Sequence, residues 1–171
     1  MSTSISSQST GAGWRVWPWM LPVLAIIGLD QFTKTLATQL LSYGEAVAVN
    51  PYLNWTLLYN RGAAFSFLSD ADGWQRWFFI GVSTVVSIVI VTWMVRLPRS
   101  AAWQQLSLAL ILAGAIGNLW DRLFLGHVVD FIQVHYNHYY WPAFNIADSA
   151  ITLGAIGMIV DAVFFSRQSR H

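Results

Sequence analysis

Two stretches of the chain, residues 77–95 and residues 100–120, are strongly apolar and contain no charged side chain. Each has about the 20 residues that a helix needs to cross about 30 Å of hydrocarbon. Charged residues make up only 10% of the 171 residues and hydrophobic residues 56%, whereas a soluble domain has about 25% charged residues. A soluble globule of this size could not cover so much apolar surface. The sequence therefore predicts a small integral membrane protein.

Two further apolar stretches carry charges. Residues 17–41 contain Asp30 and Lys34, and residues 143–165 contain Asp148 near the start and Asp161 near the end. A charge inside a spanning segment costs at least about 2.5–3.5 kcal/mol, so such residues face the helix bundle or lie at a membrane edge. The apolar pattern of the first stretch continues past Asp30 without a small-residue cleavage site, which argues against a cleaved signal peptide.

We therefore expect an all-α integral membrane protein with four transmembrane helices. Residues 1–13 are small, polar and uncharged, which predicts a disordered tail. Residues 14–171 form a single domain in this interpretation, with outward loops at about 42–76 and 122–142.

Four spans place both chain ends on one side of the membrane. Arg96 and Arg99 lie in the short turn between the two charge-free stretches, and seven of the eight acidic residues lie toward the opposite side. The positive-inside rule then places both termini in the cytoplasm. The basic residues on the cytoplasmic side are Arg15, Arg96, Arg99, Arg167 and Arg170.

Composition also excludes several function classes. The chain has no cysteine, which excludes disulfides, thiolate metal sites and cysteine nucleophiles. Its net charge of +1, without a basic run, disfavours nucleic-acid binding.

Polar residues gather near the outward ends of the predicted helices. Asp30 and Lys34 lie four residues apart on one helical face, as an internal ion pair or as the mouth of a polar site. Gly114, Asn118 and Asp121 share a face of the third helix, either as a packing seam of small residues or as a hydrogen-bond network with Arg122.

Residues 59–65 (YNRGAAF) follow a segment of β-like composition, and Gly62 after Asn60-Arg61 indicates a tight turn. The structural interpretation is a hairpin on the outer face of the protein. The functional one is a platform where small residues let a peptide backbone approach and Asn60 supplies hydrogen bonds.

Two carboxylates flank the second outward loop. Asp130 sits in an apolar stretch, HVVDFI, with poor access to water, and Asp148 follows Asn145 at the spacing of a helix N-cap. Taken singly, Asp130 fits a loop aspartate and Asp148 fits a helix cap.

Taken together, Asp130 and Asp148 lie at the exit of the third helix and the entrance of the fourth, which antiparallel packing would bring close. Two carboxylates in a low-dielectric pocket share a proton. One can then act as a general base toward water while the other donates to a scissile carbonyl. This is the chemistry of aspartic peptidases, and it needs no metal or cofactor.

A metal site would compete for the same acids. His127, His135 and His138 are close in sequence, but no recognised ligand pattern is present. We expect these histidines to lie at the membrane interface, and we expect no bound metal.

The chain resembles the lipoprotein signal peptidases, the type II signal peptidases of bacteria. The resemblance rests on five motifs in order: D-x-x-[ST]-K (30–34), N-x-G-A-A-F (60–65), G-A-x-x-N-x-x-D-R (114–122), V-V-D-F (128–131) and W-P-A-F-N-x-A-D (141–148). It implies a membrane aspartic endopeptidase of the bacterial inner membrane with a small extracytoplasmic β-sheet cradle. Its substrates would be diacylglyceryl-modified prolipoproteins, cleaved N-terminal to the lipidated cysteine, and globomycin-like inhibitors would occupy its site.

By motif position, the resemblance implies that Asp130 and Asp148 form the catalytic dyad. Substrate binding or support of the dyad would fall to Asn60, Gly62, Asn118, Arg122 and Asn145. Structural polar support would come from Asp30, Lys34 and Asp121.

Two other function classes are alternatives to a peptidase. A proton- or ion-coupled transporter would use the acidic residues as relays, which requires acids distributed across the membrane depth. Here seven of the eight acidic residues lie toward one side, which disfavours a transporter. A non-enzymatic membrane scaffold would use the polar residues only as caps and packing contacts. The expected partners are the prolipoprotein substrates, membrane lipid and globomycin-like inhibitors, with no nucleic acid, and we expect a monomer.

Overall fold

The computed structural model describes residues 16–62, 74–98 and 100–165, which form four long helices and one small sheet. The helices are α1 (Trp17–Leu40), α2 (Trp74–Arg96), α3 (Ala102–Phe124) and α4 (Ile146–Val160), and a turn of π-helix, η3 (Asp161–Phe165), extends α4. Within these residues, four helices are long and apolar enough to cross a membrane, which confirms the expected number of spans.

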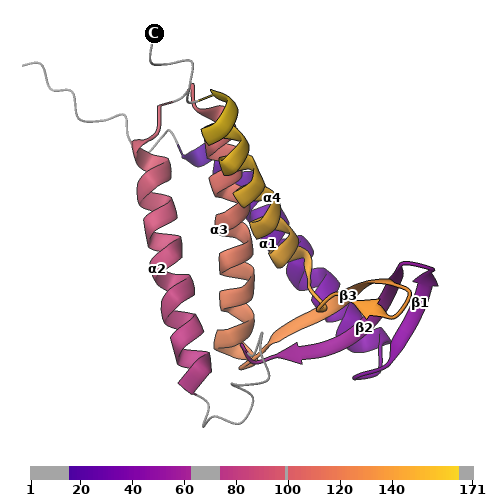
Figure 1. The fold of residues 1–171 in the computed structure, drawn as a ribbon. Helices are drawn as coiled ribbons and strands as arrows, with labels where there is room; N and C mark the ends of the chain where they lie inside the picture. Colours follow the sequence, from indigo (N-terminus) through magenta and orange to yellow (C-terminus); the bar gives the residue numbers. More distant parts are fainter. Residues whose placement is uncertain (1–15, 63–73, 99, 166–171) are drawn as a thin grey trace, which may run out of the picture.

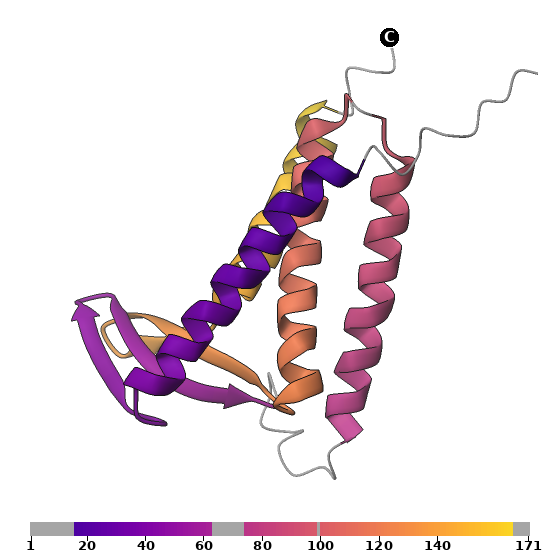
Figure 2. The ribbon, with the colours of Figure 1, turned by 180° about the vertical axis from the view of Figure 1, so that it is seen from behind.

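The helices pack around α3, which contacts α1, α2 and α4 (Figure 1). Seen from behind, α1 begins near one end of α2 and runs in front of α3 toward the sheet (Figure 2). The central position explains why α3 has the largest buried share of its residues, while the other helices expose large apolar side chains, as expected of surfaces that face lipid. The core lies between α3 and its neighbours and includes Met94, Leu108 and Leu112.

Two helix boundaries differ from the expected ones. Residues 122–124 were predicted to lie in the second outward loop, but α3 continues to Phe124 and its C-cap is Leu125. Asp121 and Arg122 therefore lie inside the last turns of a helix, where their side chains keep the 3–4 spacing of Gly114 and Asn118. At the other end of that loop, α4 begins at Ile146 rather than at residue 143.

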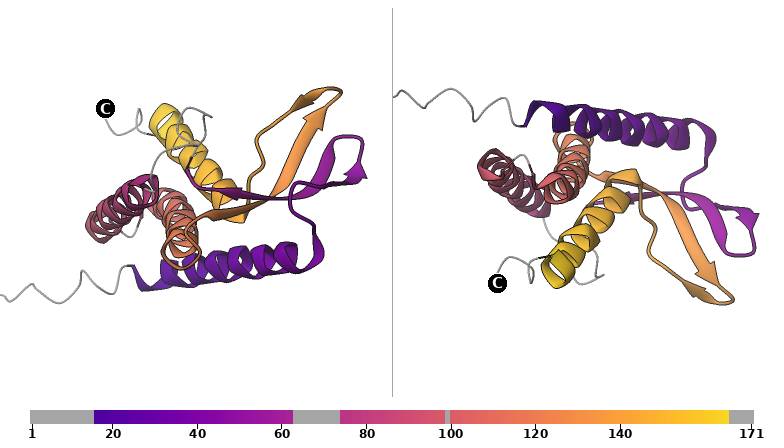
Figure 3. Two further views of the ribbon diagram at one scale, coloured as in Figure 1. Left: turned by 90° about the horizontal axis from the view of Figure 1, so that it is seen from below. Right: turned by 90° about the horizontal axis from the view of Figure 1, so that it is seen from above.

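The sheet has the strand order β1-β2-β3-β4, all antiparallel: β1 (Ala46–Asn50), β2 (Leu53–Asn60), β3 (Val128–Tyr136) and β4 (Tyr139–Tyr140). It extends sideways from one end of the bundle, as the views along the helices show (Figure 3). The β-like composition of residues 52–59 thus predicted β2 correctly, and the apolar stretch around Asp130 is β3. The start of α1 and the end of α4 lie together at the opposite end of the bundle (Figure 1).

The seam between α3 and α4 depends on glycine. A Cβ added to Gly114 would lie 2.2 Å from the Ala147 carbonyl oxygen, and one added to Gly154 would lie 2.5 Å from the Ser107 carbonyl oxygen. The two backbones therefore approach closely because side chains are absent, as the small-residue interpretation predicted.

This close approach predicts that Gly114→Ala destabilises the bundle by about 1–3 kcal/mol, because the added methyl group overpacks the seam. Gly28→Ala is the matched control, since a Cβ at Gly28 meets nothing within 4 Å among the described residues. Unfolding in mixed detergent micelles measures both. Equal stability of the two variants would contradict the close approach.

Candidate active site

Asp130 lies on β3, where the sheet meets the helices. It pairs with Leu58 on β2 and is only 3% exposed. Its Oδ1 accepts a hydrogen bond from Asn145 Nδ2 at 2.8 Å, and the Asn60 side chain also hydrogen bonds with its carboxyl group. The apolar neighbours along β3 remove water from this carboxyl, as the sequence predicted.

Asp148 lies in the first turn of α4 and is half-buried. Its Oδ1 accepts a hydrogen bond from Asn118 Nδ2 at 2.7 Å. Its backbone N–H donates to Asn145 Oδ1 at 2.9 Å, which confirms Asn145 as the N-cap of α4. A carboxylate in this position also benefits from the positive end of the helix dipole.

Two asparagines connect the carboxylates. Asn145 is fully buried, and its Nδ2 group lies 2.8 Å from Asp130 Oδ1 and 3.4 Å from Asn118 Oδ1. Asn118 in turn donates to Asp148. The carboxylate pair, Asp130 and Asp148, is therefore linked through side-chain amides from α3 and from the N-cap of α4. The expected meeting of the two loop ends is confirmed.

The asparagines are themselves held by a buried ion triad, Asp30, Lys34 and Asp121. Lys34 Nζ lies 2.7 Å from Asp30 Oδ2 and 2.8 Å from Asp121 Oδ2. It also donates to Asn118 Oδ1 at 3.2 Å. The triad thus joins α1 to α3 and fixes the amide that contacts Asp148.

The triad also holds the two segments that carry the carboxylate pair. Asp30 Oδ1 accepts from the backbone N–H of Ala147 at 2.9 Å, next to Asp148. Asp121 Oδ2 accepts from the backbone N–H of Val129 at 3.2 Å, next to Asp130. The ion pair expected within α1 is therefore present, and it extends into a network that positions the site.

Arg122 lies at the same end of the bundle and interacts electrostatically with Asp148 and Asp130. Its guanidinium lies 5.1 Å above the ring of Phe79 on α2, and its Nε is buried without a hydrogen-bond partner among the described residues. Gly62 follows β2 with a φ of +102°, and its N–H donates to Asn60 Oδ1 at 2.8 Å. The predicted tight turn is confirmed. Residues 63–65 of its motif lie outside the described residues.

Burial dominates the electrostatics of Asp130. Loss of solvation first, and the nearby Asp148 carboxylate second, raise the pKa of Asp130 to about 7, although hydrogen bonds from Asn60 and Asn145 oppose the rise. Burial and the nearby carboxylate therefore favour the protonated form of Asp130. Asp148, more exposed and at a helix N-terminus, has the better environment for a negative charge.

The three histidines His127, His135 and His138 form no metal site among the described residues. His127 packs on Tyr59 at 4.3 Å between ring centroids, and His135 stacks on Tyr140 at 5.3 Å. Among the described residues, no group of three histidine or acidic side chains is arranged to hold a metal ion.

The sequence motifs did not identify two residues that contact the site, Gln31 and Phe79. Gln31 donates to Asp121 Oδ1 at 2.8 Å and to Asp30 Oδ2 at 3.3 Å, so it completes the shell around the triad. Its position next to Asp30 in the sequence was the one feature that could have indicated this role. Phe79, which contacts Arg122 and lies against Gly62, gives no signal, because it is one aromatic residue among many on an apolar helix.

Known proteins are similar to this chain over most of its length. Residues 22–164 match the family model described as signal peptidase (SPase) II. The chain belongs to the signal peptidase II family. Its curated relatives include the lipoprotein signal peptidases of Acinetobacter baumannii, 56% identical over 86% of this chain and 84% of that one, and of Pseudomonas putida, 51% identical over 92% and 91%.

A solved structure shows a similar fold. It is a bacterial membrane enzyme determined by the in meso method at 2.3 Å resolution, with a TM-score of 0.79 at 31% identity. The alignment covers 90% of this chain and 92% of that one. The resemblance inferred from the five motifs is thus confirmed, and the protein is a membrane peptidase of lipoprotein processing.

Proposed function

We propose that this signal peptidase II cleaves diacylglyceryl-modified prolipoproteins on the N-terminal side of the lipidated cysteine, with Asp130 and Asp148 activating a water molecule. The observation that carries the proposal is the carboxylate pair, buried Asp130 and half-buried Asp148, linked through Asn118 and Asn145. No cofactor is needed, because both halves of the acid–base chemistry are present in the pair.

The reaction follows from the unequal environments of the two acids. Ionised Asp148 takes a proton from water, and the water oxygen attacks the scissile carbonyl carbon. Protonated Asp130 donates to the carbonyl oxygen, which gives a tetrahedral diol. Asp148 then passes its proton to the amide nitrogen, Asp130 recovers a proton from the diol, and the C–N bond breaks. The products are a signal peptide with a free carboxyl group and a lipidated cysteine with a free amine.

The supporting residues follow from the contacts described above. The buried Nε of Arg122 has no hydrogen-bond partner among the described residues, and Arg122 interacts favourably with both acids, which suits it to a substrate carbonyl. At Gly62 the positive φ forms the turn that brings its N–H to Asn60 Oδ1, and the Phe79 ring lies where a side chain would be. Residues that bind substrate or support the pair are Asn60, Gly62, Asn118, Arg122 and Asn145, and structural polar support comes from Asp30, Lys34 and Asp121.

We also propose a multi-pass location in the bacterial inner membrane, with both termini in the cytoplasm and the active site at the periplasmic face. The support is the common end reached by the start of α1 and the end of α4, with the sheet at the other end (Figure 1), together with the basic turn after α2. The proposed unit is a monomer with one peptidase domain, residues 14–171, and a tail, residues 1–13, that lies outside the described residues.

Purified protein and a synthetic lipobox peptide test the function. Mass spectrometry is expected to find cleavage directly before the cysteine when that cysteine carries diacylglyceryl, and not when it carries a free thiol. Globomycin is expected to block the reaction. Cleavage at another bond, or equal cleavage of the unmodified peptide, contradicts the proposal. The same protein in liposomes is expected to show no proton flux, which a transporter would produce.

The pH dependence of the reaction follows from the raised pKa of Asp130. Donation to the carbonyl needs Asp130 protonated, so kcat/KM is expected to fall as the pH rises through about 7. A pH series with one lipopeptide at constant ionic strength measures the fall. A rate that does not change between pH 6 and pH 9, a range chosen to lie about one to two units around that pKa, would contradict the assignment of the proton.

A further inference from the structure

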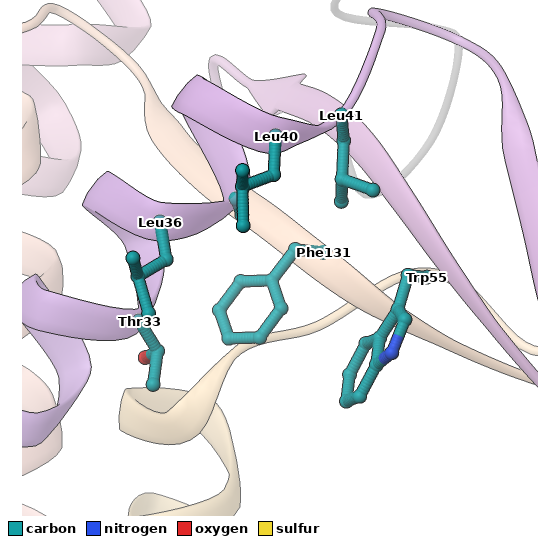
Figure 4. Close-up of a pocket in the computed structure, with 7 residues that line it drawn as sticks. Thr33, Leu36, Leu40, Leu41, Trp55 and Phe131 are labelled. Atoms are coloured by element: carbon teal, nitrogen blue, oxygen red, sulfur yellow. The ribbon is translucent and has the colours of Figure 1, made fainter.

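An apolar pocket of about 230 Å³ lies between the last turns of α1 and strands β2 and β3 (Figure 4). Figure 4 shows the rings of Phe131 and Trp55 facing the side chains of α1 across it. The lining residues are Thr33, Leu36, Ala37, Leu40, Leu41, Trp55 and Phe131.

The lining side chains carry two polar groups, the Thr33 hydroxyl and the indole N–H of Trp55, and the others are apolar. Thr33 carries the only side-chain hydroxyl, and that hydroxyl donates to the carbonyl oxygens of Leu29 at 2.8 Å and Asp30 at 3.0 Å. A water molecule needs about 30 Å³ and two to four polar partners, while an apolar cavity of about 150 Å³ stays dry and accepts an apolar ligand. The pocket therefore favours an apolar occupant.

The strands beside the pocket are already paired. Strand β2 pairs with β1 on one side and β3 on the other, and the N–H groups of Phe131 and Ile132 donate to the Phe144 carbonyl oxygen. A peptide segment docking here would find no free strand edge for its amides. An alkyl chain needs no such partners.

The pocket is adjacent to the proposed reaction site. Phe131 follows Asp130 directly, so their Cα atoms are about 3.8 Å apart. On α1, Thr33 and Ala37 flank Lys34, whose ammonium group contacts Asn118 beside Asp148. The pocket thus lies next to the strand segment that carries Asp130 and to the turn of α1 that carries Lys34. Leu36 and Leu40, 36% and 77% exposed, open the pocket toward the lipid-facing side of α1.

We propose that this pocket holds one acyl chain of the substrate's diacylglyceryl group. The proposal rests on the proposed function. Several methylene groups fill the volume, and the remainder of the chain continues past Leu36 and Leu40 into the membrane. The acyl chain then places the scissile bond at the carboxylate pair, so the pocket makes lipidation a condition for positioning rather than only for membrane attachment.

The test is a set of lipopeptides with one peptide sequence and butanoyl, octanoyl or palmitoyl chains. Ala37→Leu fills the pocket, and Thr38→Leu is the matched control, because Thr38 is exposed and is not part of the lining. Loss of room for two methylene groups is expected to lower kcat/KM for the palmitoyl substrate about 10-fold. The butanoyl substrate is expected to change little, and Thr38→Leu to change neither.

An equal loss for all chain lengths would overturn the proposal. So would a loss that follows the residue before the cysteine instead of the acyl chain, since a peptide side chain would then be the occupant. Failure of the wild-type protein to cleave any lipidated peptide would instead refute the proposed function, which keeps the two outcomes distinct.

A photoreactive acyl chain gives a second measurement that does not depend on how Ala37→Leu folds. Asp148→Asn protein is incubated with a lipopeptide carrying a diazirine in mid-chain and then irradiated. Labelling is expected at Leu40 or Trp55, with competition by unlabelled lipopeptide but not by phosphatidylglycerol. Labelling outside the pocket, or equal competition by phosphatidylglycerol, would overturn the assignment to the substrate.

Discussion

Asp130→Asn and Asp148→Asn are each expected to lower the turnover of a lipidated lipobox peptide about 10²–10⁴-fold, because each removes one half of the acid–base pair. Asparagine keeps the size of the side chain, so the fold should persist. The measurement is single-turnover cleavage by purified variants. The double variant is expected to be little slower than either single one, since the two carboxylates act as one unit.

Asp161→Asn is the matched control. Asp161 is also a buried acid, 9% exposed, but it lies at the other end of α4, where Gln104 donates to its carboxylate. Its replacement is expected to leave turnover within a few-fold of wild type. Either dyad variant that retains more than about a hundredth of wild-type turnover would remove that residue from the proposed chemistry.

The charge pattern of the sequence was sufficient to predict the spans. Residues 77–95 and 100–120 could be identified directly as spanning helices, because they contain no charge and charge inside a bilayer is costly and rare. The exact end of α3 could not be read in this way. Asp121 and Arg122 look like the polar edge of a membrane, yet Asp121 is paired with Lys34 inside the bundle, so the helix continues without exposing it.

The members of the site were predictable, but their connections were not. Asp130 and Asp148 stood out because carboxylates beside apolar residues need an explanation. That Lys34 bridges Asp30 and Asp121 while also holding Asn118 depends on the packing of α1 against α3, which spacing along one helix does not encode. The apolar pocket likewise depends on how the sheet meets α1, and its residues look like ordinary lipid-facing side chains in the sequence.

Lys34→Met is expected to cost about 3–5 kcal/mol of stability, because it leaves two carboxylates, Asp30 and Asp121, without their shared cation. Lys34 is only 3% exposed, and the acids are no more exposed, so water cannot replace the lost partner. The loss is measured by unfolding in mixed detergent micelles and by yield from membranes. Activity should fall as well, since Asn118 loses the contact that orients its amide toward Asp148.

The charge-free triple variant, Lys34→Met with Asp30→Asn and Asp121→Asn, separates unpaired charge from lost packing. Removing a whole buried ion network is often neutral or stabilising, whereas removing one partner is not. The triple variant is therefore expected to recover most of the stability lost in Lys34→Met. It should not recover turnover, because the Lys34 ammonium group that donates to Asn118 is still missing. A triple variant as unstable as Lys34→Met would show that the cost lies in packing or hydrogen bonding. Full recovery of turnover would show that the triad only stabilises the fold and does not position the site.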